Sequence, residues 1–300
     1  MSYSLMALIA EKQSEFSKGQ RLIADYITKN YDKAAFMTAY KLGQTVGVSE
    51  STVVRFAAEL GFDGYPQLQK AMQELTRSRL TSIQRIEATE ARMSGDEVLE
   101  NIISCDIANI RKTLEEVPQE VFNAAVEAIV NARRVYIYGA GSSRALAIFL
   151  AYYLKMLMID VNLMSTSSET EIFEDMLHIG AEDVAIGISF PRYSSKAVKA
   201  MHFAHTRNAP VIAITDSQIS PIAGLATYLL LAHSDTAAIV DSLVAPLSLI
   251  NAIIVAISLK KKDVVTSRLL ELEKIWEEFE VYQKRSEEHT SELQSQFHLV

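Results

Sequence analysis

The amino-acid sequence predicts an all-α domain followed by an α/β domain with a doubly wound parallel sheet, in the manner of a flavodoxin-type three-layer sandwich. Up to about residue 80, apolar side chains such as Leu22, Ile23, Tyr26 and Ile27 recur at helical spacing, and no segment there has the pattern of a strand. Beyond Arg134, short β-branched or aromatic runs alternate with helical segments. Most of these runs are too continuously apolar for a sheet with one face in water, which favours parallel strands covered by helices on both faces.

Length and composition fit two globular domains. The chain has 300 residues, of which 49% are hydrophobic, so each domain can bury a core. It has no run of about 18 uncharged apolar residues, and its first residues lack the features of a signal peptide. We therefore expect a cytoplasmic protein with no membrane partner. The single cysteine, Cys105, has no neighbouring cysteine or histidine, so no disulfide, metal site or other cofactor is expected.

The charge is distributed unevenly along the chain, whose net charge is −8. Residues 1–80 hold ten Lys and Arg against eight Asp and Glu, a net +2, whereas the remainder holds 19 against 29, a net −10. Nucleic-acid binding depends on a local basic surface rather than on total charge, and this division places any such surface at the N-terminus.

The first informative element is a predicted helix-turn-helix between residues 38 and 61. Leu42 and Val46 mark a short helix, Gly47 suits a left-handed turn, and Ser49 can cap the helix that follows. Gly61 then ends this second helix. One face of the second helix carries the apolar residues Val53, Phe56, Ala57 and Leu60, and these are expected to pack.

The opposite face of the second helix is polar, and we predict that it binds double-stranded DNA. Ser51, Thr52 and Arg55 lie in its first turns, where a recognition helix presents side chains to the major groove. Ser49 lies beside them at the cap. Lys41 and Lys70, on flanking helices, can hold backbone phosphates. The alternatives are a helical bundle with an ordinary polar surface and a head that binds another protein.

Residues 81–117 are predicted to form a linker and a connecting helix. Ser94 and Glu97 form a capping-box signal ahead of an amphipathic run. The apolar stripe of this run is expected to pack on the second domain; it consists of Val98, Ile102, Ile103, Ile107, Ile110 and Leu114.

The second domain is assigned to residues 118–284. Five strands are expected, at residues 135–138, 161–164, 184–188, 211–215 and 228–231, followed by helices at about 243–259 and 264–284. Residues 285–300 lack periodicity and are expected to be a disordered or non-native tail.

Two loops of the second domain carry the chemistry of an anion site. The first strand runs through Gly139, Gly141, Ser142 and Ser143 into a helix, where small residues, hydroxyls and the unpaired N–H groups of a helix start suit an anion. A tight turn without ligand is the alternative. A third glycine at dinucleotide-binding spacing is missing, which argues against a dinucleotide.

The second loop follows the third strand and carries Ser189, Arg192, Ser194 and Ser195. Loops at the carboxyl ends of parallel strands meet in one crevice, so we expect both loops to line the same site. Glu169, after the second strand, is also a candidate for ligand contact.

An isomerase-type enzyme is the competing functional class, because sugar-phosphate isomerisation needs a positioned Glu or His base. Glu171 and Glu174 join Glu169 as candidates, and the histidines are His178, His202, His205 and His233. Each histidine is interpreted as a surface or hydrogen-bonded helix residue, and no catalytic residue is assigned.

Both halves resemble a known family. Residues 46–65, VGVSESTVVRFAAELGFDGY, resemble the helix-turn-helix of the RpiR family of bacterial sugar-responsive regulators, V-G-V-S-x-x-T-V-x-R-F-x-x-x-L-G-F-x-G-[FY], almost without departure. The second domain is similar to the SIS (sugar isomerase) domain of these regulators over about residues 120–260. In that domain the loops read G-x-G-x-S and S-x-S-G-x-[ST], and their hydroxyls bind the phosphate of a phosphosugar. The resemblance implies that Ser143, Ser189 and Ser194 have this role.

The second loop departs from the family pattern, because Phe190-Pro191-Arg192-Tyr193 replaces its small Ser-Gly centre. Arg192 can pair with a phosphate through two hydrogen bonds, or it can favour a carboxylate. Our hypothesis is a homodimeric or homotetrameric regulator with two winged or plain helix-turn-helix heads, in which a small phosphorylated effector alters the spacing of the heads. Residues 81–95 would carry the rearrangement.

Overall fold

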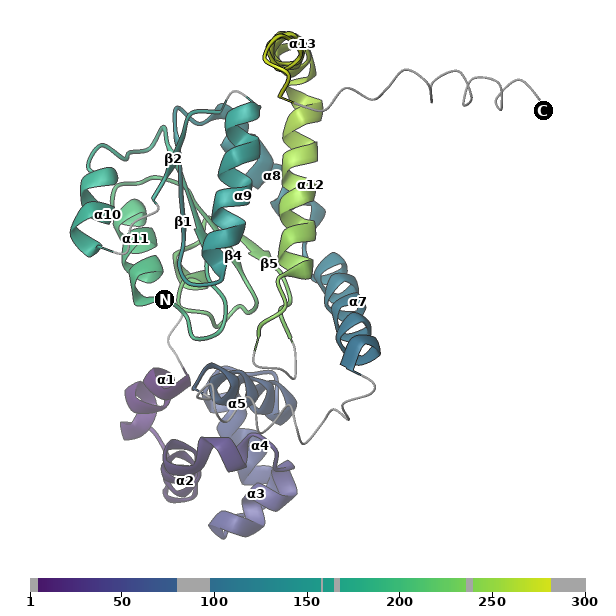
Figure 1. Cartoon of the computed structure of the whole chain (residues 1–300). Helices are drawn as coiled ribbons and strands as arrows, with labels where there is room; N and C mark the ends of the chain where they lie inside the picture. The colour runs from purple at the N-terminus through teal and green to yellow at the C-terminus, as the bar shows by residue number, and fades with distance from the viewer. Residues whose placement is uncertain (1–4, 80–97, 158, 165–167, 236–239, 282–300) are drawn as a thin grey trace.

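The computed structural model describes residues 5–79, 98–157, 159–164, 168–235 and 240–281. Within them, an N-terminal helical unit precedes an α/β part, as predicted (Figure 1). The helical unit consists of α1 (Leu5–Glu11), the short η1 (Lys12–Ser14), α2 (Lys18–Ala34), α3 (Ala39–Val46), α4 (Glu50–Glu59) and α5 (Tyr65–Arg79).

The helical unit has its own hydrophobic core. Phe56 of α4 is fully buried and its ring lies 5.1 Å from that of Phe16, centroid to centroid. The apolar face predicted for α4 points into this core, because Val53, Phe56, Ala57 and Leu60 are all buried. Tyr65 closes the unit by donating a hydrogen bond to the carbonyl of Met37 at 2.7 Å, and burial raises its pKa to about 12.

The connecting helix, α7 (Val98–Glu116), packs on the α/β part through its polar side, opposite to the prediction. Asn109 and Thr113 are buried, whereas the predicted packing stripe faces outward. The exposed members of that stripe are Val98, Ile103, Ile107, Ile110 and Leu114. The physical reason is that Asn109 and Thr113 on the polar side form hydrogen bonds with Asp235 and His233 of the α/β part. Ser94 and Glu97, the predicted cap, lie outside the described residues.

The α/β part contains a five-stranded parallel sheet in the order β2-β1-β3-β4-β5, the flavodoxin-like order. The strands are β1 (Val135–Gly139), β2 (Val161–Leu163), β3 (Val184–Ile188), β4 (Val211–Thr215) and β5 (Tyr228–Leu231). All five lie where the sequence predicts them, within a residue at their ends. Three of them, β1, β3 and β4, are buried along their whole length, which explains their uninterrupted apolar pattern.

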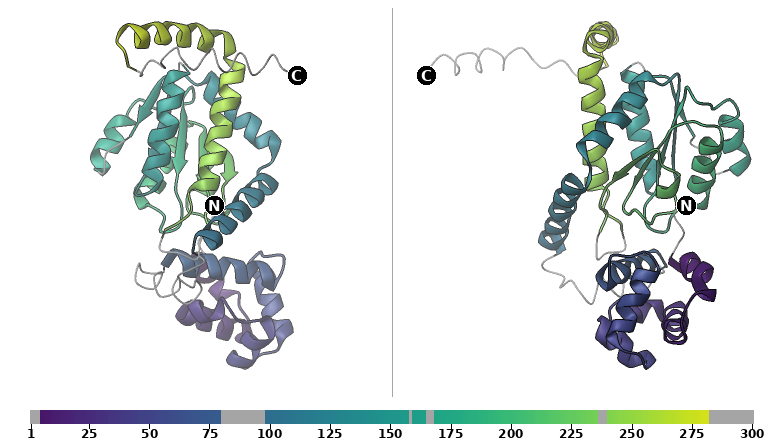
Figure 2. Two further views of the ribbon diagram at one scale, coloured as in Figure 1. Left: turned by 45° about the vertical axis from the view of Figure 1, so that its right-hand side comes forward. Right: turned by 180° about the vertical axis from the view of Figure 1, so that it is seen from behind.

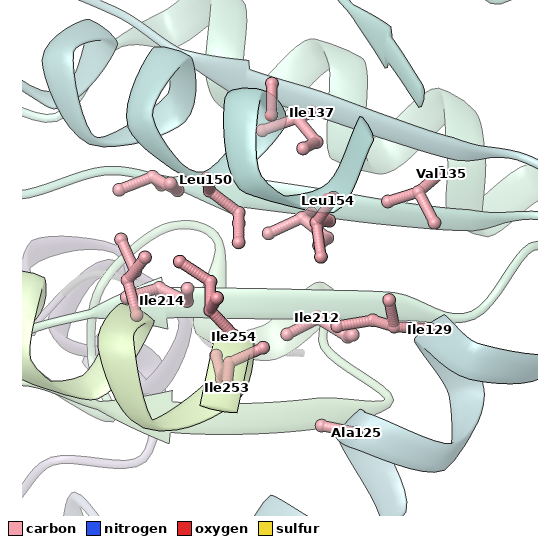
Figure 3. Packing of buried hydrophobic residues seen from close by; sticks show 14 of the residues in the cluster. Ala125, Ile129, Val135, Ile137, Leu150, Leu154, Ile212, Ile214, Ile253 and Ile254 are labelled. Carbon is pink, nitrogen blue, oxygen red and sulfur yellow. The ribbon is translucent and has the colours of Figure 1, made fainter. Parts of the chain in front are cut away.

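Helices cover both faces of the sheet, as a doubly wound fold requires (Figure 2). One core lies between the sheet and α8 (Gln119–Asn131), α9 (Ser143–Met156) and α12 (Val244–Lys260), where Ile137, Leu150 and Ile253 meet (Figure 3). The other lies under α10 (Glu169–Asp175) and α11 (Ser195–Thr206), where Tyr136 of β1 packs. Adjacent residues of β1 thus serve opposite cores, because side chains alternate along a strand.

The C-terminal helix α13 (Lys262–Glu278) meets α12 at a sharp bend of 98°. No helix of the described chain is by itself long and apolar enough to cross a membrane, and α12 and α13 meet that test only when counted together across their bend. A short η3 (Ala223–Leu225) precedes β5. The predicted tail, residues 285–300, falls outside the described residues.

Candidate functional site

The helix-turn-helix geometry depends on two local features of α3 and α4. Gly47 adopts the left-handed conformation with φ of 77°, and Gly43 is packed so closely that a Cβ there would lie 2.8 Å from the carbonyl oxygen of Val48. Ser49 caps α4 because its Oγ accepts the backbone N–H of Thr52. The same Oγ lies within 2.9 Å of the Ser51 hydroxyl. Ser49 is thus used mainly to hold the start of α4.

The exposed side of α4 presents Ser51 and Arg55 to solvent. Arg55 Nε donates to the carbonyl of Ser51 at 3.2 Å, which lays its guanidinium along the first turn of the helix. Thr52 is half-buried, and its Oγ1 lies 2.8 Å from Ser49 Oγ. Lys41 is exposed on α3, which packs directly against α4. We call this set of polar residues on the two contacting helices, Lys41, Ser51, Thr52 and Arg55, the α4 surface.

Lys70 is not part of the α4 surface. It is exposed on α5, which lies on the side of the unit towards the sheet (Figure 1). Burial is the main cause that lowers the pKa of His233 in the α/β part, and the positive charge of Lys70 makes a smaller contribution in the same direction. The structure thus places Lys70 at the side of the helical unit that faces the second domain.

The two loops predicted to form an anion site do meet. They line one cavity of about 340 Å³ at the carboxyl edge of the sheet. The lining residues from the first loop are Ala140, Gly141, Ser142 and Ser143, and those from the second are Ser189, Phe190, Pro191, Arg192 and Ser194. The cavity lies at the switch point between β1 and β3, where the strand order reverses and open α/β sheets bind ligands.

The first loop offers hydroxyls more than backbone donors. The N–H groups of residues 143–145 donate to carbonyls three residues earlier at 3.2 Å, so the prediction of unpaired N–H groups at the start of α9 is wrong for these three. Ser142 makes no capping hydrogen bond and Ser143 is buried at the cavity wall. Gly141, with φ of 58°, forms the turn.

Gly139 serves packing rather than ligand approach, which corrects the prediction. It is not among the cavity residues, and a Cβ there would lie 2.5 Å from the carbonyl oxygen of Ser143. The absence of a side chain lets α9 begin directly against β1. Gly139 therefore positions Ser143 at the cavity without touching its interior.

The second loop keeps a glycine-like backbone without a glycine. Arg192 stands at the Gly position of the S-x-S-G-x-[ST] pattern and has φ of 64°, a conformation that costs most L-residues about 1–2 kcal/mol. Ser189 is buried at the cavity wall. Ser194 caps α11 by accepting the N–H of Ala197. Burial raises the pKa of Tyr138, and a hydrogen bond with Ser194 partly offsets that effect.

Besides Gly139, two more predicted residues do not reach the cavity. Ser195 is exposed as the first residue of α11. Glu169 pairs with Lys199 of α11, Nζ to Oε2 at 2.7 Å, and hydrogen bonding from Lys199 lowers the pKa of this carboxyl. The described part of the cavity lining includes no histidine and no glutamate, so none of the predicted candidate bases lines it there. Among the described residues there is no cluster of three or more groups with the arrangement of a metal site.

One cavity residue escaped sequence reasoning. Asp241 lines the cavity from the segment between β5 and α12, 98 positions after Ser143. Its only sequence signal is that it lies in the loop after a parallel strand, and such loops gather at the same edge of the sheet. The described lining therefore combines serine hydroxyls with one cationic and one anionic side chain, Arg192 and Asp241.

Comparison with known proteins matches both halves of the chain to family models. Residues 3–78 match the helix-turn-helix domain of the rpiR family, and residues 128–256 match the SIS domain. The regulator HexR of Pseudomonas aeruginosa is 25% identical over 76% of this chain and 78% of its own length. An uncharacterized HTH-type transcriptional regulator of Caldanaerobacter subterraneus is 25% identical over 90% of this chain and 98% of its own.

Solved structures show the same fold. The sugar isomerase domain of an RpiR transcription factor from Sphaerobacter thermophilus is 29% identical, with a TM-score of 0.57, over 59% of this chain and 99% of that one. The NanR protein of Vibrio vulnificus, complexed with ManNAc-6P, is 19% identical, with a TM-score of 0.58, over 93% of this chain and all of that one.

Proposed function

Because the chain belongs to the RpiR family of helix-turn-helix transcriptional regulators with a SIS domain, and is a regulator rather than an enzyme, we propose that a small phosphorylated sugar or related anionic metabolite controls its affinity for DNA. In this proposal residues 1–80 bind an operator, residues 81–117 connect the domains, and residues 118–284 bind the effector.

The observation that carries the effector proposal is the meeting of two hydroxyl-bearing loops at one cavity. Ser142, Ser143 and Ser189 can donate to phosphate oxygens, and the guanidinium of Arg192 can pair with two of them. Asp241, in the same lining, suits the hydroxyl groups of a sugar, since an ionised carboxylate only accepts hydrogen bonds. A ligand with a phosphate at one end and hydroxyls at the other fits this charge distribution better than a simple dicarboxylate does. ManNAc-6P, the compound in complex with the NanR protein, is a molecule of this class.

The α4 surface is the proposed DNA contact. Arg55 and Ser51 would face base edges or phosphates in the major groove, with Lys41 on the backbone beside them. Lys70 is left out of this proposal because it lies on α5, on the side of the helical unit towards the sheet (Figure 1). Ser49 and Thr52 support the surface through the hydrogen bond between their hydroxyls.

A homodimer or homotetramer is proposed as the working form. Two helix-turn-helix heads are needed to read a palindromic operator, and the outward apolar stripe of α7 offers a surface for a second copy. Light scattering of the full chain tests this: a monomer at micromolar concentration contradicts it.

The effector proposal is tested by thermal shift and DNA retention together. Millimolar hexose and N-acetylhexosamine 6-phosphates are screened for a rise in the melting temperature of the full chain, and each compound that binds is added to the chain on operator DNA obtained by selection. We expect at least one compound to raise the melting temperature and to change DNA affinity ~5- to 150-fold, a typical coupling between two sites. Stabilisation without a change in DNA affinity, or no stabilisation by any compound, contradicts the proposal.

A further inference from the structure

The polar side of α7 is bonded at several points to the segment between β5 and α12. Residues 236–239 of this segment lie outside the described residues. On their N-terminal side, Asn109 Nδ2 and Cys105 Sγ both donate to the carbonyl of Asp235, at 2.7 and 2.9 Å. The backbone N–H of His233 donates to Thr113 Oγ1 at 2.9 Å. After the gap, Ser242 Oγ donates to Asp106 Oδ1 at 2.6 Å. We call this set of contacts the α7 clamp.

The α7 clamp is buried enough to act as a unit. Asn109, Thr113 and His233 are each less than a tenth exposed. His233 Nε2 lies 2.9 Å from Glu116 Oε2, at the end of α7. Buried polar groups are costly to leave without partners, so α7 and the described residues that it contacts are expected to move together or to exchange between discrete arrangements.

The clamped segment also borders the effector cavity. Asp241 lines the cavity and Ser242, the next residue, bonds to α7. Consecutive Cα atoms are about 3.8 Å apart, so a residue of the cavity lining and a residue of the clamp are direct neighbours along the backbone. At its N-terminal end, α7 lies on the side of the α/β part that is nearest to the helical unit (Figure 1). The clamp therefore lies between the cavity and the DNA-binding unit.

We propose that the α7 clamp is the element through which effector occupancy reaches the helix-turn-helix. Sugar hydroxyls donate to Asp241, the position of Asp241 sets the Ser242–Asp106 contact, and α7 follows. The inference rests on the effector proposal above and adds a distinction to it: a free phosphate ion fills the serine loops without engaging Asp241, so only a phosphorylated sugar alters α7.

Hydrogen–deuterium exchange of the full chain tests this without knowledge of the operator. Glucose 6-phosphate and N-acetylmannosamine 6-phosphate are compared with inorganic phosphate at equal ionic strength, in the wild type and in Thr113→Val, Asp106→Ala and the control Ser104→Ala. Thr113→Val keeps the shape of the side chain and removes the hydroxyl that accepts the N–H of His233. Ser104, the control position, is an exposed polar residue of the same helix. We expect all three ions to slow exchange in the Ala140–Ser143 loop, and at least one sugar phosphate to change exchange in α7 ~5-fold or more, the lower end of typical couplings.

Each outcome bears on the proposal. Protection of the loop in every variant, with the α7 response lost in Thr113→Val and Asp106→Ala and kept in Ser104→Ala, supports it. A loop response without an α7 response in the wild type, an equal response of α7 to inorganic phosphate, or clamp variants that behave as the wild type overturn the clamp and leave the effector proposal standing. No loop response to any of the three ions contradicts the effector proposal itself, and the clamp with it.

Discussion

Replacing Arg192 with glycine should separate the folding role of this residue from its binding role. Arg192 has φ of 64° at a position where the SIS pattern has Gly. Relief of that conformation is worth about 1–2 kcal/mol. The additional freedom of glycine in the unfolded chain costs roughly 0.5–1 kcal/mol. We therefore expect Arg192→Gly to leave the free energy of unfolding unchanged or to raise it by about 1 kcal/mol, in spite of the lost side chain.

The same substitution removes the only cationic side chain among the described residues that line the cavity. A hydrogen bond to a charged group contributes about 1.5–3 kcal/mol, so the affinity for a sugar phosphate should fall roughly 10- to 100-fold. Urea unfolding measures the first effect and isothermal titration calorimetry with glucose 6-phosphate or N-acetylmannosamine 6-phosphate measures the second. Glu280→Gly is the matched control, because Glu280 has φ of 50° in an exposed position after α13.

The control should gain stability in the same way and keep its affinity for sugar phosphates. A loss of more than about 1 kcal/mol of stability in Arg192→Gly would show that the side chain, and not the backbone, decides the loop conformation. Unchanged binding would remove Arg192 from the site.

Four further predictions concern the site and its supports. Gly139→Ala should destabilise the chain by about 1–3 kcal/mol in urea unfolding and weaken sugar-phosphate binding, because the new Cβ would lie 2.5 Å from the carbonyl oxygen of Ser143. No change in stability or in binding would contradict the packing role of Gly139. Ser143→Ala should reduce calorimetric affinity for the same ligands by about 1 kcal/mol with little change in melting temperature, and equal affinity would exclude this hydroxyl. Arg55→Ala should cost about 1–3 kcal/mol of operator affinity in gel-shift titration, whereas unchanged retention would favour a head that binds protein. Burial raises the pKa of Asp183, but hydrogen bonds from Arg133 and from the N–H of Gly180 outweigh burial, so the pKa is lowered overall. The contribution of this carboxylate to stability should therefore be complete above about pH 4 and should be lost as the pH falls further. Asp183→Asn should flatten this acid limb of the urea-unfolding profile, and an unaltered limb would refute the assignment.

Local patterns were sufficient for the strands, for the exposed polar face of α4 and for the two loops that line the cavity. The five strands follow from short β-branched, aromatic or aliphatic runs, of which β1, β3 and β4 are buried along their whole length. The turn before α4 follows from Gly47 and Ser49, and all these features depend on residues close in sequence. The meeting of the Ser143 and Ser189 loops was also predictable, because parallel strands bring their carboxyl ends to one edge.

The tertiary structure decided which candidates reach the cavity. Glu169 belongs to an ion pair with Lys199 instead, and Gly139 has a packing role that depends on where α9 crosses β1. Asp241 entered the lining from a segment that no local pattern singles out. In each case the deciding contact joins residues on different elements, and their distance in space is not encoded in spacing along the chain.

The orientation of α7 is the clearest division between the two sources. Periodicity established from the sequence alone that residues 98–116 form an amphipathic helix, but the rule that apolar sides face inward chose the wrong side. The polar side is buried because Asn109 and Thr113 find hydrogen-bond partners 126 and 120 positions away, at Asp235 and His233. A polar group is buried only where a partner is in place, and that partner exists only once the sheet has brought the segment after β5 beside the helix.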